Sequence, residues 1–274
     1  MSTEDTPRTD AEAVISTALA AAKPATLDAD ADYSVIVPEG ALLARFSGEE
    51  YAAYPRRKRG LFHLEDEASF IAYVQRHSDL GTEAWASEPN TRIVAVLDGH
   101  STAAAGWQQH RAALTLRHSP GWSAWLGSNR KMLSQSDFSE HVEDRIVDFV
   151  EPDGATMLEL AQSFQASSKG RFESSKRLAS GETTLEWREE VDAKAGHKGA
   201  LTIPDSFTLG LVPFVGGPAY KVTARLRYRI ADGVLRLGYV LDRPEDVHAQ
   251  AFTELVERVA GAIAAPVFAG SPTT

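Results

Sequence analysis

The sequence of 274 residues contains no cysteine. Disulfide bonds, thiol catalysis and zinc sites with cysteine ligands are therefore excluded. No apolar run approaches the roughly 20 residues that a membrane-spanning helix needs. The first ten residues are polar and mostly acidic, unlike the basic start of a signal peptide. These absences predict a cytoplasmic protein that has no membrane partner.

Motifs of the familiar enzyme classes are also missing. The sequence has no phosphate-binding glycine loop, no dinucleotide fingerprint, no HExxH zinc motif and no nucleophile elbow. We therefore assign no catalytic residue, metal site or cofactor, and the sequence favours a non-enzymatic protein.

What is present is an ordinary globular composition with an acidic balance. Apolar residues make up 43% of the chain and charged residues 24%, and the formal net charge is −10. This charge argues against a protein whose whole surface follows nucleic acid, but it leaves room for a local basic patch.

The chain divides by composition into an arm and a globular part. Residues 1–32 are predicted to be a flexible N-terminal arm with a short helix over Asp10–Ala22, which Pro24 ends. Residues 33–274 are predicted to form a single α+β domain, with a sub-boundary near residue 168. Its first strand is expected at Tyr33–Val37.

Apolar periodicity predicts the elements of the middle of the chain. Ala68–His77 is expected to be a helix, and Arg92–Leu97 and His110–His118 are expected to be strands. A second helix is predicted from Ser134 or Ser136, with Phe138, Val142, Ile146 and Phe149 on one face. The segment Glu151–Gly154 ends it, and a further helix follows with Met157, Leu160, Ala161 and Phe164 on its apolar face.

The segment Tyr220–Leu241 predicts a β-hairpin around the turn pair Asp232-Gly233. A two-residue turn places four apolar pairs on one face, which fixes the register. The pairs are Ile230 with Leu235, Tyr228 with Leu237, Leu226 with Tyr239, and Ala224 with Leu241.

Other C-terminal segments complete the prediction. Phe172–Leu178 and Glu182–Val191 are expected to pair around Ser180-Gly181, and Leu201–Val215 is expected to be extended. Asp242 and Glu245 resemble a capping box at the start of a closing helix that runs to about Ile263. Because strands and helices segregate, the sequence favours an α+β fold, an antiparallel sheet with a C-terminal hairpin and packing helices.

The polar face of the hairpin is the first candidate site. It carries Lys221, Arg225, Arg227 and Arg229, and the register places Arg229 opposite Arg236. Like charges that face each other destabilise a sheet unless a bound anion neutralises them. One interpretation is a site for a nucleic-acid backbone. The alternative is pairing with Glu182, Glu186 and Glu190 on a neighbouring strand.

A second basic cluster and a group of tryptophans are further candidates. Arg56, Arg57, Lys58 and Arg59 could contact phosphate, or they could form a solvated loop. Trp107, Trp122 and Trp125 could stack on bases, although packing in a core is the commoner role of tryptophan.

Two acidic groups raise the alternative of a metal-dependent hydrolase. Asp98, His100 and His110 follow or begin predicted strands, as ligands of hydrolytic metals do, but a capped turn with two hydrogen-bonded histidines explains them equally. The acidic residues between Glu140 and Asp153 are interpreted as the solvated face of a helix.

Several stretches, taken together, resemble the YfdQ-like family of uncharacterised phage and prophage proteins. The matching stretches, within residues 90–270, include Leu97–His100, Trp107, Ser119–Trp122, Glu151–Asp153, Ala161–Gln165, Arg177–Gly181, Gly216–Tyr220, Arg225–Arg229 and Asp242–Pro244. The resemblance implies a phage-derived, non-virion gene product, encoded near recombination functions. It implies no catalytic residues.

Three functions remain open on this basis. The first is a self-associating, non-enzymatic accessory of DNA recombination or replication, which forms homo-oligomers and binds single-stranded DNA. The second is a structural protein that assembles into rings or shells. The third is a metal-dependent hydrolase or nuclease.

Overall fold

The structure is a computed structural model that describes residues 9–21, 49, 52–174, 185–195, 202–231 and 234–272. The chain divides into two units, Met1–Arg56 and Arg57–Thr274. In the first unit, α1 (Asp10–Ala21) confirms the predicted helix. Thr9 and Glu12 form a capping box there, because the backbone N–H of each donates to the side chain of the other. The predicted strand Tyr33–Val37 lies outside the described residues.

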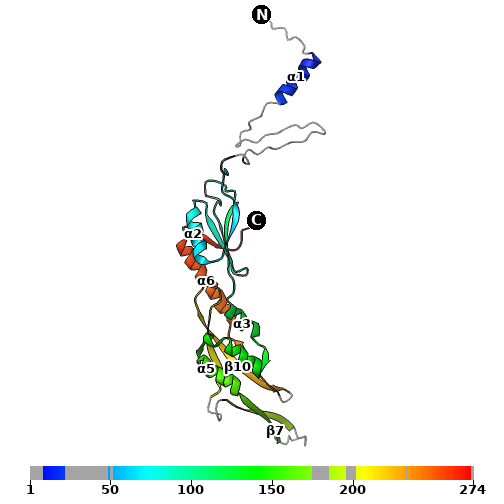
Figure 1. Cartoon of the computed structure of the whole chain (residues 1–274), viewed down its shortest axis with the longest axis vertical. Coiled ribbons are helices and arrows are strands. Elements are labelled where there is room, and N and C mark those ends of the chain that lie inside the picture. Colours follow the sequence, from blue (N-terminus) through cyan, green and yellow to red (C-terminus); the bar gives the residue numbers. More distant parts are fainter. Residues whose placement is uncertain are drawn as a thin grey trace, which may run out of the picture. The chain divides into compact units, whose positions relative to one another are not determined.

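In the second unit, one five-stranded sheet packs against two helices. Its strand order is β1-β4-β3-β2-β12, in which β1 pairs with β4 and β2 with β12 in parallel. Helices α2 (Glu67–His77) and α6 (Pro244–Ala262) lie side by side against one face (Figure 1). The strands are β1 (Gly60–Leu64), β2 (Glu83–Ser87), β3 (Arg92–Val96), β4 (His110–Thr115) and β12 (Val267–Ala269).

A second five-stranded sheet, with the order β5-β11-β10-β9-β6, is antiparallel throughout. Its core contains Trp122, Trp125, Phe138 and Tyr239, which are all buried. The strands are β5 (Met132–Ser134), β6 (Phe149–Glu151), β9 (Ser206–Leu211), β10 (Tyr220–Ala231) and β11 (Val234–Leu241), and the helices are α3 (Pro120–Ser128), α4 (Gln135–Glu143) and α5 (Gly154–Ser163).

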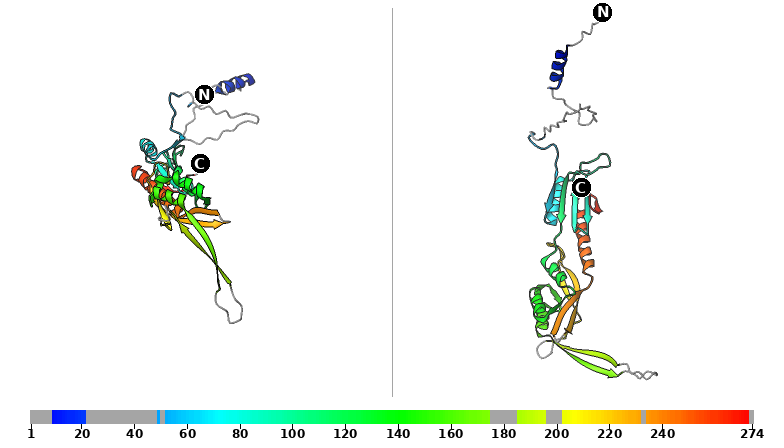
Figure 2. Two further views of the ribbon diagram at one scale, coloured as in Figure 1. Left: turned by 60° about the horizontal axis from the view of Figure 1, so that its bottom comes forward. Right: turned by 90° about the vertical axis from the view of Figure 1, so that its right-hand side faces the viewer.

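A separate two-stranded ribbon is formed by β7 (Gln165–Ser174) and β8 (Leu185–Lys194), which pair antiparallel (Figure 2). The pairing agrees with the predicted hairpin, although both strands begin and end elsewhere than expected. The predicted turn at Ser180-Gly181 lies outside the described residues.

The α+β fold class is confirmed, and so is the register of the hairpin of β10 and β11. All four predicted apolar pairs form, and Arg229 faces Arg236. The turn pair Asp232-Gly233 lies outside the described residues. Within the described part of the chain, no helix combines the length and apolarity needed to cross a bilayer.

Two of the predicted boundaries and one predicted cap are wrong. Helix α4 starts at the expected cap, Ser134, but ends at Glu143, and Phe149 belongs to β6. Strand β4 ends at Thr115, three residues before His118. Helix α6 has no capping box, because Arg243 takes a left-handed conformation with φ 42° in place of a capping side chain. The following proline disfavours a right-handed helical conformation at Arg243.

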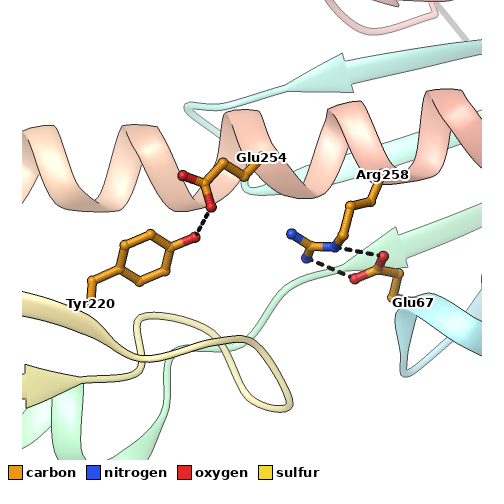
Figure 3. Close-up of polar contacts among 4 residues, drawn as sticks. All are labelled: Glu67, Tyr220, Glu254 and Arg258. Carbon is orange, nitrogen blue, oxygen red and sulfur yellow. Dashed lines mark hydrogen bonds and ion pairs between the residues drawn. The ribbon is translucent and has the colours of Figure 1, made fainter.

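Helix α6 belongs to the cores of both sheets. Val247 packs against the core of the second sheet, whereas Leu255 and Val259 are buried in the core of the first. The hydroxyl of Tyr220, at the start of β10, donates to Glu254 on α6 (Figure 3). Contacts with this one helix therefore join the two sheets.

Two glycines test how closely the second sheet is packed. A methyl group at Gly238 of β11 would lie 2.2 Å from the carbonyl oxygen of Lys131, whereas one at Gly261 of α6 meets no described atom within 4 Å. We expect Gly238→Ala to lower the free energy of unfolding by about 1–3 kcal/mol, because the backbone must move. Gly261→Ala should leave it unchanged or raise it by up to about 1 kcal/mol. Urea denaturation of both variants measures the difference, and equal stabilities would contradict the close approach.

Candidate nucleic-acid interface

The five basic residues predicted on the hairpin share one exposed face of the second sheet. Side chains alternate along β10, so that Val222, Ala224 and Leu226 are buried at 1%, 0% and 7% exposure. The intervening residues point the other way and are exposed. We call this set the arginine face; it comprises Lys221, Arg225, Arg227, Arg229 and Arg236.

The arginine face concentrates positive charge, and the cross-strand partners of three of its residues are small. Arg229 and Arg236 are direct partners across the hairpin. Gly238 lies opposite Arg227, Ser206 opposite Arg225 and Gly210 opposite Lys221. None of the five basic side chains forms an ion pair with a residue whose side chain the structure describes, which leaves out the side chains of residues 166–194. Asp205 is the acidic residue beside this face, since it precedes Ser206 and its carbonyl oxygen accepts the backbone N–H of Leu226 on β10.

The expectation that the Glu-rich strand lies next to β10 in the sheet is wrong. The hydrogen-bonded neighbours of β10 are β9 and β11, whereas β8 pairs with β7. In that ribbon, Glu190 lies opposite Lys169 and Glu186 opposite Glu173. Glu182 lies outside the described residues. The sheet therefore supplies no row of carboxylates beside the arginine face.

The second basic cluster separates into individual contacts. The guanidinium of Arg57 lies 3.9 Å from the ring centroid of Trp107, a cation–π contact. The Nζ of Lys58 lies 3.2 Å from Nδ1 of His77. Arg56 and Arg59 are exposed, and the backbone N–H of Arg56 donates to Glu49.

The three tryptophans also separate. Trp122 and Trp125 are 1% and 0% exposed and belong to the core of the second sheet, whereas Trp107 is 68% exposed. Packing in the core therefore explains two of them. Trp107 is the one that a ligand can reach.

Asp98, His100 and His110 do not form a metal site. The two carboxylate oxygens of Asp98 accept the backbone N–H groups of Gln109 and His110, at 3.0 and 2.8 Å. Nδ1 of His100 accepts the N–H of Gly106, and Nε2 of His110 lies 2.9 Å from the hydroxyl of Tyr73. Within the described residues, no group of three histidine or acidic side chains could hold a metal ion. Their hydrogen bonds hold a loop in place.

Among the acidic residues around α4, Glu140, Glu143 and Asp144 are exposed, as expected, whereas Asp148 and Asp153 have structural roles. Asp148 accepts the indole N–H of Trp125 at 2.7 Å, and Asp153 caps α5. His141 packs between Trp125 and Tyr239, where burial lowers the pKa of its imidazole. These contacts explain the group without a nuclease centre.

A pocket of about 400 Å³ was not predicted from the sequence. Its apolar wall includes Ile71, Leu114 and Phe214. At its rim, Arg258 donates two hydrogen bonds to Glu67 (Figure 3). Burial, together with Glu254, raises the pKa of Tyr220 to about 12. These polar groups satisfy one another, and partners almost 200 residues apart leave no local signal in the sequence.

The comparison with protein families gives one match. The family model described as "Uncharacterized conserved protein (DUF2303)" matches residues 7–272. The chain belongs to the DUF2303 family. No curated protein and no solved structure matches it. Membership in this family assigns no activity.

Four partly or fully buried histidines make stability depend on pH. Burial is the main cause that lowers the pKa of His77, His110, His141 and His248 below the ordinary 6.5. Just below pH 6.5 the unfolded chain therefore binds more protons than the folded chain, and the free energy of unfolding falls as the pH falls.

We expect the melting temperature to be lower at pH 5.5 than at pH 7.5, as followed by thermal denaturation. His248→Gln should reduce this dependence, whereas His63→Gln, on the exposed strand β1, serves as the matched control. A melting temperature that is constant or rises on acidification would contradict the folded-state preference for neutral imidazoles.

Proposed function

We propose that the chain binds single-stranded DNA through the arginine face, as a non-enzymatic accessory of DNA recombination or replication encoded by a phage or prophage. The observation that carries this proposal is the arginine face itself. Five basic side chains share one exposed sheet surface and make no ion pair with a described side chain, although the whole chain has a net charge of −10. The phage setting rests on the resemblance to YfdQ-like proteins.

The geometry of a strand suits an extended polyanion. Residues that alternate along β10 are about 6.6 Å apart, a spacing comparable with that of phosphates in an extended single strand. Guanidinium groups bind phosphate with two parallel hydrogen bonds. Contacts of this kind position the nucleic-acid backbone and carry no sequence information. The proposal is therefore binding that depends on salt and tolerates any sequence.

Salt titration tests the arginine face. We expect Arg225→Glu combined with Arg227→Glu to weaken binding to an oligothymidylate strongly. Two lost phosphate contacts should also reduce the slope of log K against log salt by about 1.4. Fluorescence anisotropy at several salt concentrations measures both quantities.

The matched control is Arg117→Glu combined with Arg243→Glu, which makes the same change of charge. Both residues form exposed ion pairs elsewhere, with Glu65 and Asp246. The control should keep the salt slope of the wild type. If the Arg225/Arg227 variant has the wild-type affinity and slope, the arginine face does not bind DNA.

Self-association is a second candidate property, and the open face of the first sheet favours it. Helices α2 and α6 cover the other face. Across all five strands, the register aligns Phe268, Trp85, Val94, Ala113 and His63 in one row. Phe268 is 43% exposed, and Leu61, also on this face, is 46% exposed. Val94 and Ala113 in the middle of the row are buried at 8% and 0% exposure, so a second copy of the chain would cover the exposed apolar side chains at its two ends.

Light scattering after size-exclusion chromatography tests the open face. We expect an oligomer for the wild type and a smaller particle for Phe268→Asp, because a buried carboxylate opposes association. Val147→Asp, at a residue that is 88% exposed next to the second sheet, is the control and should keep the wild-type mass. A wild-type monomer at high concentration would remove this candidate.

A further inference from the structure

Trp107 is an exposed aromatic residue that the fold holds in one place. Its side chain is 68% exposed, which is unusual for the largest apolar side chain. The guanidinium of Arg57 lies 3.9 Å above its ring. Arg57 can cover only one face of the indole, so the contact orients the ring and leaves its other face available.

Hydrogen bonds to residues before and after Trp107 hold its loop in place. The Asp98 carboxylate accepts two backbone N–H groups just after Trp107, and His100 accepts the N–H of Gly106 just before it. The N–H of Gln108 donates to the carbonyl oxygen of Asp98. The residues that resemble metal ligands in the sequence therefore fix the position of the tryptophan.

Two backbone features tighten the same loop. A Cβ at position 106 would lie 2.1 Å from the carbonyl oxygen of Gly99, so only glycine fits there. Gln108 has a φ of 54°, which residues with a side chain rarely adopt. Strained backbone of this kind persists where the surroundings enforce it, often at ligand sites. Trp107 sits between these two positions.

The surroundings of the loop are basic. Gly60, which directly follows Arg59, donates its N–H to the carbonyl oxygen of Gln109, so the basic cluster ends beside the loop. The Lys58 ammonium lies against His77. The Asp98 carboxylate is occupied by the two backbone N–H groups of the loop, whereas Arg57 and Lys58 are the cations beside Trp107 and His77. A cationic ligand is disfavoured at this site, and an anionic one is favoured.

We propose that Trp107 is a stacking platform for one base of single-stranded DNA, with Arg57 and Lys58 contacting the phosphates beside that base. This inference rests on the proposed function and extends it, since it adds contact with a base to contact with the backbone. Every base has a π face, so stacking of this kind tolerates any sequence. A duplex keeps its bases stacked on one another and cannot offer one to Trp107.

Three probes separate stacking from binding to phosphate: an oligothymidylate, an abasic oligonucleotide of the same length, and a duplex. We expect the oligothymidylate to quench tryptophan fluorescence at saturation and the other two to leave it unchanged. In Trp107→Phe the quenching should disappear while most of the affinity remains, because phenylalanine also stacks. Trp107→Ala should lose at least about fivefold in affinity for the oligothymidylate and none for the abasic strand.

The controls keep the two proposals distinguishable. Trp107 is exposed, so the melting temperature of Trp107→Ala should match that of the wild type. Equal affinity of Trp107→Ala and wild type for the oligothymidylate overturns the stacking platform, whatever the arginine face does. Quenching by the oligothymidylate that persists in the Arg225/Arg227 variant with an unchanged salt slope supports the platform and overturns the arginine face. Quenching by the abasic strand overturns stacking as its cause.

Discussion

The packing of α6 is the interaction on which the second unit depends. Ala251, Phe252, Leu255 and Val259 fill the core of the first sheet, while Val247, one turn earlier, packs against the core of the second. The bond from Tyr220 to Glu254 fixes β10 to the same helix. Both candidate surfaces depend on this helix, since the first sheet supports the Trp107 loop and the second presents the arginine face. A weakened α6 would disturb both surfaces.

The arginine face follows from the pleat of β10 only in part. Burial of Val222, Ala224 and Leu226 requires the residues between them to face outward, and any polar side chain satisfies that requirement. The fold does not require arginine at these positions. Placing Arg229 opposite Arg236 costs stability, because two like charges meet without an ion pair to a described side chain. That cost is the physical reason to look for an anionic ligand on this face.

The features that could be predicted from the sequence are those that interactions between residues close in sequence determine. The hairpin register follows from a two-residue turn and an alternating pattern, so all four apolar pairs were predictable. The order of strands is a long-range property, which is why the Glu-rich segment was wrongly expected beside β10. The end of α4 could not be predicted from apolar spacing. Ile146 and Phe149 continue the helical pattern, although both lie outside the helix. The contact of Arg57 with Trp107 spans 50 positions and has no local signal. Asp98 and His100 left a metal site open as an alternative, because metal ligands and side chains that accept backbone N–H groups have the same appearance in a sequence.

The two candidate surfaces use different physics, and this difference favours a single strand as their common ligand. Binding of phosphates to a basic surface such as the arginine face would arise from the release of counterions and would weaken as salt rises. Stacking on Trp107 needs an unpaired base and depends little on salt. The net charge of −10 opposes the binding of a polyanion outside basic patches such as these two. A duplex can satisfy the arginine face but not the tryptophan, and a peptide of acidic residues likewise satisfies only the first. Among these polyanions, single-stranded nucleic acid is the one that supplies both an extended row of phosphates and free bases.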